Sequence, residues 1–388
     1  MQEFRISRIY RFLLFTVGIP LSLLFLWILF KLFTDFTSNT NVNWILVPIV
    51  ITMILIMILG ILDAQLNKIT IEEDSIYQRT IIGSRRLAFE NIKGYRDNNS
   101  IIEIEPINSS QKKIKIASYY ENRNVLRTWL KENFEDLNLL EKNQEKEEIL
   151  RDDKYGWTKE RRKEKLNKAK TIARIYNTIG AICGLMTLFY PNPYTLIISL
   201  SIILPIIGLF IIKQSDGMIR FVGRNNSAYI SLEIGLFLTI IALILRALLD
   251  FNIYDYTNIW LPAIVISLGY ILILFVGNKE FAFIKIADYF NNLVLIIMLF
   301  GYGYSTTVLT NSLFDNTTPT YFNTTVVNKQ ISSSKIIIYY FYLKSWGPNK
   351  IRSKMSVSKF DYKSFSPGDE ITITLHNGLF DIPWYEVK

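Results

Sequence analysis

Cysteine and histidine are nearly absent from this sequence of 388 residues, which contains one of each, Cys183 and His376. A single cysteine excludes a disulfide within the chain, and one residue of each type cannot form a Cys/His zinc cluster. A Ser-His-Asp triad would have to use His376. That residue follows a predicted strand, where it could be a turn residue, a pH sensor or a general base. We therefore expect no cofactor, no metal site and no catalytic residues.

Charged residues are scarce in several apolar stretches of membrane-spanning length. Half of all residues are hydrophobic, and the mean hydropathy is +0.22. Hydrocarbon does not tolerate unpaired backbone groups, so each stretch is predicted to be a transmembrane helix. The first stretch follows three arginines but lacks a small-residue cleavage site, which favours a retained anchor over a signal peptide. The stretches cover residues 12–33, 44–62, 171–189, 194–212, 229–249, 260–276 and 293–309.

Lysine and arginine are present in every second connection between these stretches, although the formal net charge of +9 says little by itself. The connections at 34–43, 190–194 and 251–259 contain neither residue. By the positive-inside rule, the N-terminus and the large internal block are cytoplasmic, and the C-terminal block is extracytoplasmic. The basic residues on the cytoplasmic side include Arg5, Arg8, Arg11, Lys213, Arg220, Arg224, Lys279 and Lys285.

The block after the second stretch shows the period-two alternation of short strands, at 68–72, 101–105 and 113–116 among others. From residue 121 the apolar period changes to that of a helix. Strands followed by one amphipathic helix indicate a small open β-barrel. The run SRRLAFENIKGY at 84–95 and the closing LRTWL at 126–130 resemble the bacterial PH-like domains. This resemblance implies a domain that binds lipid headgroups or peptides.

Basic residues within this block could face anionic lipid. The alternative is an ordinary solvated strand face, since Glu72, Glu73 and Glu90 are interspersed. The following segment, 139–171, is strongly charged and ends in a basic helix typical of an interfacial anchor. Nucleic acid is not an expected partner, because acidic residues are mixed in and no aromatic stacking platform accompanies the basic ones. The candidate lipid-facing residues are Arg85, Arg86, Lys112, Lys113 and Lys115.

Three ionisable residues lie within the predicted helix at 229–249 or at its end: Glu233, Arg246 and Asp250. Ionisable groups in membrane helices are functional candidates, and Arg246 and Asp250 share a helix face. They could line a polar cleft for an anion or a proton. The alternative is a locally paired arginine that anchors the helix end.

The C-terminal block is predicted to be a small all-β domain. A polar linker at 311–325 precedes a β-branched and aromatic strand at 335–343, and further strands follow at 370–375 and 382–387. The sequences WGP at 346–348, GD at 368–369, IPWY at 382–385 and RALLD at 246–250 resemble parts of uncharacterised bacterial polytopic membrane proteins. That resemblance implies a shared architecture and no known activity.

The predicted architecture is a membrane protein with an α-helical bundle of about seven transmembrane helices. A cytoplasmic PH-like domain, a β-barrel plus a helix, is inserted into it, and a small all-β domain ends it. The five segments are a two-helix hairpin (1–63), the PH-like domain (64–138), the charged linker with a juxtamembrane helix (139–171), a five-helix bundle (172–310) and the extracytoplasmic β-domain (311–388).

The expected role is non-enzymatic: binding, scaffolding or signalling across a bacterial inner membrane. Two soluble recognition-type domains on opposite sides and the lack of catalytic residues favour it. The expected partners are the lipid bilayer and a membrane or periplasmic protein. A transporter or channel that uses the five-helix bundle is the alternative, although no internal repeat supports it. An intramembrane enzyme fits least, because the predicted helices contain no paired aspartates, metal ligands or activated nucleophile.

Overall fold

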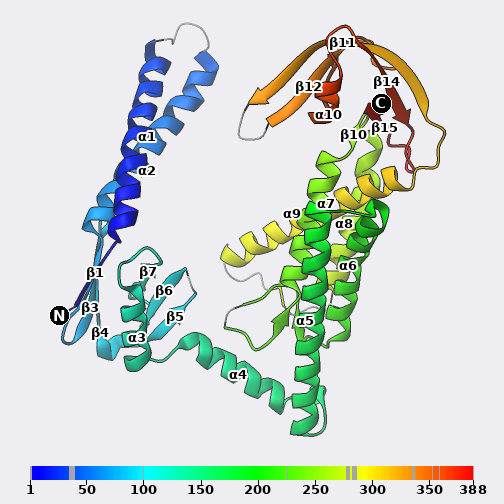
Figure 1. Ribbon diagram of the computed structural model, residues 1–388. Coiled ribbons are helices and arrows are strands. Elements are labelled where there is room, and N and C mark those ends of the chain that lie inside the picture. Colours follow the sequence, from blue (N-terminus) through cyan, green and yellow to red (C-terminus); the bar gives the residue numbers. More distant parts are fainter. Residues whose placement is uncertain are drawn as a thin grey trace. The chain divides into compact units, whose positions relative to one another are not determined.

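The computed structural model describes residues 2–34, 40–98, 100–224, 226–276, 280–281, 286–333, 337–351, 353–357 and 359–387. The chain forms two compact units: Met1–Glu148 with Arg224–Ala228, and Ile149–Gly223 with Tyr229–Lys388. Figure 1 shows the helices and strands of both. The predicted loop residues Lys279 and Lys285 and the predicted strand residue Lys335 lie outside the described residues.

Two apolar helices of the first unit, α1 (Arg8–Thr34) and α2 (Thr40–Leu66), pack against each other as a hairpin. Large side chains such as Phe12 and Ile56 are exposed, as expected for helices whose surroundings are lipid. Six helices among the described residues are long and apolar enough to cross a membrane, and they support a multi-pass membrane protein. They are Arg8–Thr34, Leu46–Leu66, Lys159–Phe189, Tyr194–Gln214, Thr257–Phe275 and Tyr289–Leu313.

The soluble part of the first unit contains two antiparallel sheets and a helix. Alternate strand residues such as Ile102 and Ile114 are fully buried, and helix α3 (Arg123–Asn133) adds Leu126 and Leu130 to the same core. The predicted strands followed by one amphipathic helix are therefore present. The sheets are β1 (Gln2–Arg5), β2 (Lys68–Ile71), β3 (Ser75–Thr80) and β4 (Gly83–Ala88), and β5 (Ile92–Asp97), β6 (Ile101–Pro106) and β7 (Ile114–Ala117).

Strand β1 precedes the hairpin in sequence, yet it is an edge strand of the first sheet. Phe4 pairs with Ile69 of β2, and Phe4 and Ile6 are buried in the core. The β-domain predicted at 64–138 thus also includes residues 2–6, and the two-helix hairpin is inserted between its first two strands. The sequence prediction missed this strand because four residues before a helix carry no readable alternation.

A long charged helix, α4 (Leu137–Arg151), occupies much of the segment predicted as a linker. Its start is tied to the second sheet by Arg96 of β5, whose guanidinium also bonds Glu105 at 3.0 Å and pairs with Glu141 of α4. Because Arg96 donates to it, the pKa of Glu141 falls to about 2, and the pair stays charged at neutral pH.

In the second unit, four of the six candidate spans form a group with α7, which is packed against α5, α6 and α9 (Figure 1). Helix α7 has 17 residues and begins four residues later than the predicted stretch at 229–249. It is therefore shorter than the six candidate spans above, of which Thr257–Phe275 includes a 3-10 turn before α8, and its length is about 26 Å. The five are α5 (Lys159–Phe189), α6 (Tyr194–Gln214), α7 (Glu233–Leu249), α8 (Trp260–Phe275) and α9 (Ile286–Leu313).

The C-terminal part of this unit is a curled six-stranded sheet, in agreement with the predicted all-β domain. Its order is β10-β15-β14-β11-β12-β13, and Ser356 of β13 lies 3.4 Å from Asn252 of β10, so the two edges approach. Phe341, Leu343 and Trp346 are buried in its core. The strands are β10 (Asn252–Ile253), β11 (Thr320–Ser333), β12 (Ile337–Leu343), β13 (Ser353–Val357), β14 (Glu370–His376) and β15 (Trp384–Val387).

Two segments of this sheet differ from the sequence prediction. Strand β11 begins at Thr320, inside the segment predicted as a polar linker, because threonine and aromatic residues favour strands and this segment pairs with β14. Its first half pairs with β14 and its second half with β12, on either side of an irregularity between Val326 and Asn328. Strand β10 comes from the loop between α7 and α8, so that loop and the C-terminal domain lie at the same end of the helices.

Candidate functional site

Arg246 lies at the end of the helix group where α5 and α7 end and where α9 leads into the C-terminal sheet. We name this end of the helix group the β-domain end. Its Nε donates to the carbonyl oxygen of Thr187 at 2.6 Å, and its Nη2 to that of Leu188 at 2.8 Å. These carbonyls belong to the last turn of α5 and have no partner within that helix. The guanidinium therefore caps α5 from α7.

Asp250 completes the same cluster. Nη1 of Arg246 lies 3.2 Å from Oδ1 of Asp250, and the hydroxyl of Tyr194 donates to Oδ2 at 2.6 Å. Tyr194 is the first residue of α6, so the cluster connects the ends of α5, α6 and α7. The side chains of Arg246 and Asp250 are each 21% exposed. The geometry is that of a locally paired arginine at a helix end.

Glu233 is not part of this cluster, because it is the first residue of α7 and Asp250 follows the last. The separation of Glu233 and Asp250 along the helix is about 26 Å. Its Oε2 accepts from the backbone N–H of Gly223 at 2.7 Å. The carboxylate of Glu280, which the sequence analysis did not select, accepts from the N–H groups of Phe221 and Val222. Two carboxylates thus hold three consecutive N–H groups of the loop before α7.

Tyrosine hydroxyls from three helices meet the backbone of α6 around Pro205. In an apolar environment a tyrosine hydroxyl needs an acceptor, and these backbone carbonyls provide one. All three tyrosines are buried. This arrangement joins α6 to three other helices. Tyr176 donates to the carbonyl of Leu204 at 2.9 Å, Tyr270 to that of Pro205 at 2.9 Å and Tyr302 to that of Ile202 at 2.7 Å.

The basic residues proposed to face lipid in the first unit are largely paired with neighbours. Arg86 bonds Glu72, and Arg85 donates to the carbonyl of Lys113 at 2.7 Å. Lys113 pairs with Glu105, and Lys115 lies 3.1 Å from Glu103. Lys112 is exposed. This pairing favours the solvated strand face over a headgroup site.

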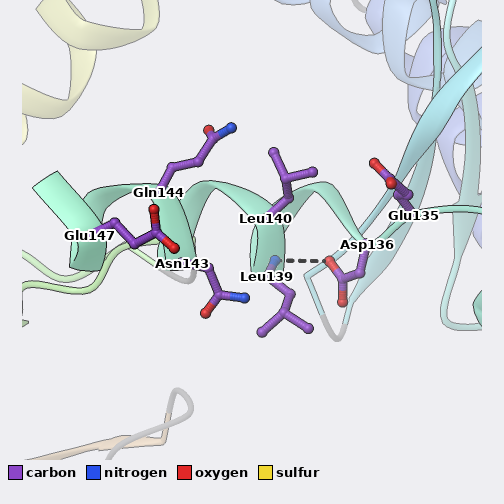
Figure 2. A pocket seen from close by; sticks show the side chains of 7 residues that line it. All are labelled: Glu135, Asp136, Leu139, Leu140, Asn143, Gln144 and Glu147. Carbon is purple, nitrogen blue, oxygen red and sulfur yellow. Dashed lines mark hydrogen bonds between the residues drawn. The ribbon is translucent and has the colours of Figure 1, made fainter.

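A shallow depression of about 340 Å³ lies on the first turns of α4. Figure 2 shows its lining, in which Asp136 accepts from the N–H of Leu139 at 3.2 Å. Its polar groups are carboxylates and amides from one helix and the residues just before it, and no basic group converges on it. Within the described ranges, no group of three or more His, Cys, Asp or Glu side chains could hold a metal ion.

Asn311 and Asp315 fasten the end of α9 to the C-terminal sheet. The side chain of Asn311 bonds the carbonyl of Ile382 and the N–H of Phe380, each at 2.9 Å. Asp315 accepts from the N–H groups of Thr317 and Gly378 and from the indole of Trp384. Both residues lie in the segment predicted to be a polar linker. A polar residue directly after an apolar stretch was their only visible signal.

His376 stacks on Trp384, with ring centroids 4.1 Å apart, and its Nε2 lies 3.7 Å from Glu386. This position on β14 is that of a core-edge residue of the sheet. The Nε2 of His376 has no hydrogen-bond partner among the residues that the structure describes.

Comparisons of the chain with protein-family models, with curated proteins and with solved structures found no match. The resemblances to PH-like domains and to polytopic membrane proteins therefore stay predictions.

Proposed function

We propose that this chain is a non-enzymatic integral membrane protein that binds or scaffolds a partner protein and links events on the two faces of a bacterial inner membrane. In this proposal the N-terminus and a PH-like domain are cytoplasmic, and the curled C-terminal sheet is extracytoplasmic. Two sheets of four and three strands with helix α3 support the PH-like assignment. The lysines and arginines near the start of α5 and the end of α6 support the orientation.

The observation that carries the proposal is the use of Glu233, Arg246 and Asp250 in structural contacts. Each bonds a backbone group or another side chain that joins helices or loops. In the transport alternative, these ionisable groups would line the path and exchange partners with the solute. These three residues were the only ones on which the transport alternative relied, so their contacts favour binding over transport.

The C-terminal sheet is the surface that we propose for partner binding. Phe360 on α10 (Lys359–Ser364) is 78% exposed, and Ile351 before β13 is 76% exposed. Both are large apolar side chains with most of their surface exposed, and protein interfaces are enriched in aromatic residues. Lys354, which lies 4.1 Å from the ring centroid of Tyr340, adds a cationic and aromatic face nearby on β13 and β12.

The test is recovery of a partner with the full chain in mild detergent, compared between variants. We expect Phe360→Ser with Ile351→Ser to lose a stoichiometric partner, while membrane insertion and the elution volume stay unchanged. Tyr321→Ser is the matched control. Tyr321 is also a large side chain and is 62% exposed, but it lies on the half of β11 that pairs with β14. Equal recovery with all variants, or no stoichiometric partner for the wild type, would contradict the proposal.

A further inference from the structure

A groove of about 290 Å³ lies between α5 and α6, at the end of the helix group where α5 begins and α6 ends. We name this the lysine end. The walls come from both helices and from the turn after α6, and no residue of the first unit contributes. The lining residues are Lys165, Lys168, Ala169, Ile172, Ile211, Gln214, Ser215, Met218 and Ile219.

The groove spans the point where α5 changes from charged to apolar. Residues 159–170 of α5 include Lys165 and Lys168, whereas the helix is mostly apolar after Arg174. Ile172 and Ile211 form the apolar wall on the side of the membrane-spanning segments. A groove with an apolar floor and a basic mouth at this depth matches the two parts of a phospholipid, its acyl chain and its phosphate.

The mouth of the groove is positive, because two lysines and no carboxylate line it. Lys165 bonds Asp216 at 2.8 Å, and this bond lowers the pKa of Asp216, so that carboxylate offsets one charge. Lys168 is exposed, and no hydrogen-bond or ion-pair partner faces it among the described residues. Its charge is therefore available to a ligand.

We propose that this groove binds an anionic phospholipid, with the phosphate at Lys168 and Lys165 and an acyl chain against Ile172 and Ile211. The adjacent pocket of about 470 Å³ does not share this chemistry. It contains Lys154, Lys213 and Arg220, but Asp152, Asp216 and Glu280 balance them. The anionic lipid is thus assigned to the groove and not to the neighbouring pocket.

The experiment measures phosphatidylglycerol bound per molecule of the full chain in phosphatidylcholine nanodiscs, by native mass spectrometry over a lipid titration. Lys168→Gln and the double variant Lys165→Gln with Lys168→Gln are compared with the wild type. Lys163→Gln is the matched control, because it removes the same charge about 140° around the helix from Lys168. We expect about tenfold weaker retention for the double variant and less than twofold for the control.

Three results would overturn the inference. Equal losses in Lys163→Gln and Lys168→Gln would mean general attraction to a basic helix. Equal retention of phosphatidylcholine and phosphatidylglycerol by the wild type would mean an apolar groove without a phosphate site. Displacement by sn-glycerol 3-phosphate at concentrations equal to the lipid would mean a site for soluble phosphates. Partner recovery through the C-terminal sheet is independent of all three results.

Discussion

The two ends of the helix group use charged residues in opposite ways. At the β-domain end, Arg246 and Asp250 bond two backbone carbonyls, a tyrosine hydroxyl and each other. At the lysine end, Lys168 is exposed at the mouth of a groove. Both ends belong to the same helices, so residue type and position in a span do not by themselves separate a structural charge from a binding charge. What distinguishes a structural charge from a binding charge is the number of hydrogen-bond acceptors near the charged side chain.

Removal of the Arg246 side chain should have the largest effect. Arg246→Ala leaves the carbonyls of Thr187 and Leu188 without their donor and Asp250 without its cation. We expect the free energy of unfolding to fall by about 3 kcal/mol, because hydrogen bonds to a charged group in a partly buried site are lost together. The measurement is an SDS titration of the purified full chain in mixed micelles.

Arg174→Ala is the matched control for this change. Arg174 is exposed on α5, and no bonding partner is found for it in the part of the chain that the structure describes. Its removal should change the free energy by less than about 0.5 kcal/mol. If the two arginine variants were equally stable, Arg246 would not fasten the helices, and the transport alternative would regain its residue.

Close packing of backbones, and not charge, holds α5 to α7 nearer the lysine end. A Cβ atom on Gly180 would lie 2.5 Å from the Cα atom of Gly235, so Gly180→Ala must push the helices apart. We expect a loss of about 2 kcal/mol in the same titration. Gly269→Ala on α8 is the control, since a Cβ there meets nothing within 4 Å. A tolerated Gly180→Ala would show that this contact is loose.

Asp315 tests the fastening of the C-terminal sheet at the β-domain end. Burial raises the pKa of Asp315, but the hydrogen bonds from Thr317, Gly378 and Trp384 outweigh it and lower the pKa below its ordinary value. The ionised carboxylate of Asp315 therefore stabilises the fold fully above about pH 4, and this stabilisation is lost as the pH falls through the folded-state pKa of Asp315. Asp315→Asn should cost about 1 kcal/mol at pH 7.

The pH dependence supplies the control for that variant. The difference in unfolding free energy between wild type and Asp315→Asn should stay constant from pH 8 to pH 5 and narrow below about pH 4. Tryptophan fluorescence follows it, because the indole of Trp384 bonds this carboxylate at 3.1 Å. A difference that grew on acidification would contradict the assigned direction of the pKa shift.

Much of the architecture follows from the sequence because apolar length and alternation are local signals. They predict the long apolar helices, the strands of the first unit and the all-β C-terminal domain. They do not predict β1 or β10, because each is a short segment beside a helix or loop whose pairing partner, β2 or β15, is distant in the sequence. The shorter α7 differs from the predicted stretch because residues 230–231 form β9 (Ile230–Ser231), which pairs with β8 (Ile219–Arg220).

The candidate polar site could be predicted only in part. The spacing of four residues correctly places Arg246 and Asp250 on one face of α7. The spacing does not reveal the carbonyls of Thr187 and Leu188, since these acceptors come from another helix. The contacts of Glu280 and the groove at the lysine end also bring together residues that are far apart in the sequence. Local sequence patterns therefore indicate neither of them.

The most direct test of the difference between the structural charge of Arg246 and the binding charge of Lys168 compares the wild type, Arg246→Ala and Lys168→Gln. The thermal unfolding midpoint and the amount of bound phosphatidylglycerol are measured for each. The account predicts that Arg246→Ala unfolds at a lower temperature while its folded fraction keeps the lipid. Lys168→Gln should keep the wild-type midpoint in lipid-free detergent and bind less lipid. Loss of lipid by folded Arg246→Ala, together with an unchanged midpoint, would contradict the account.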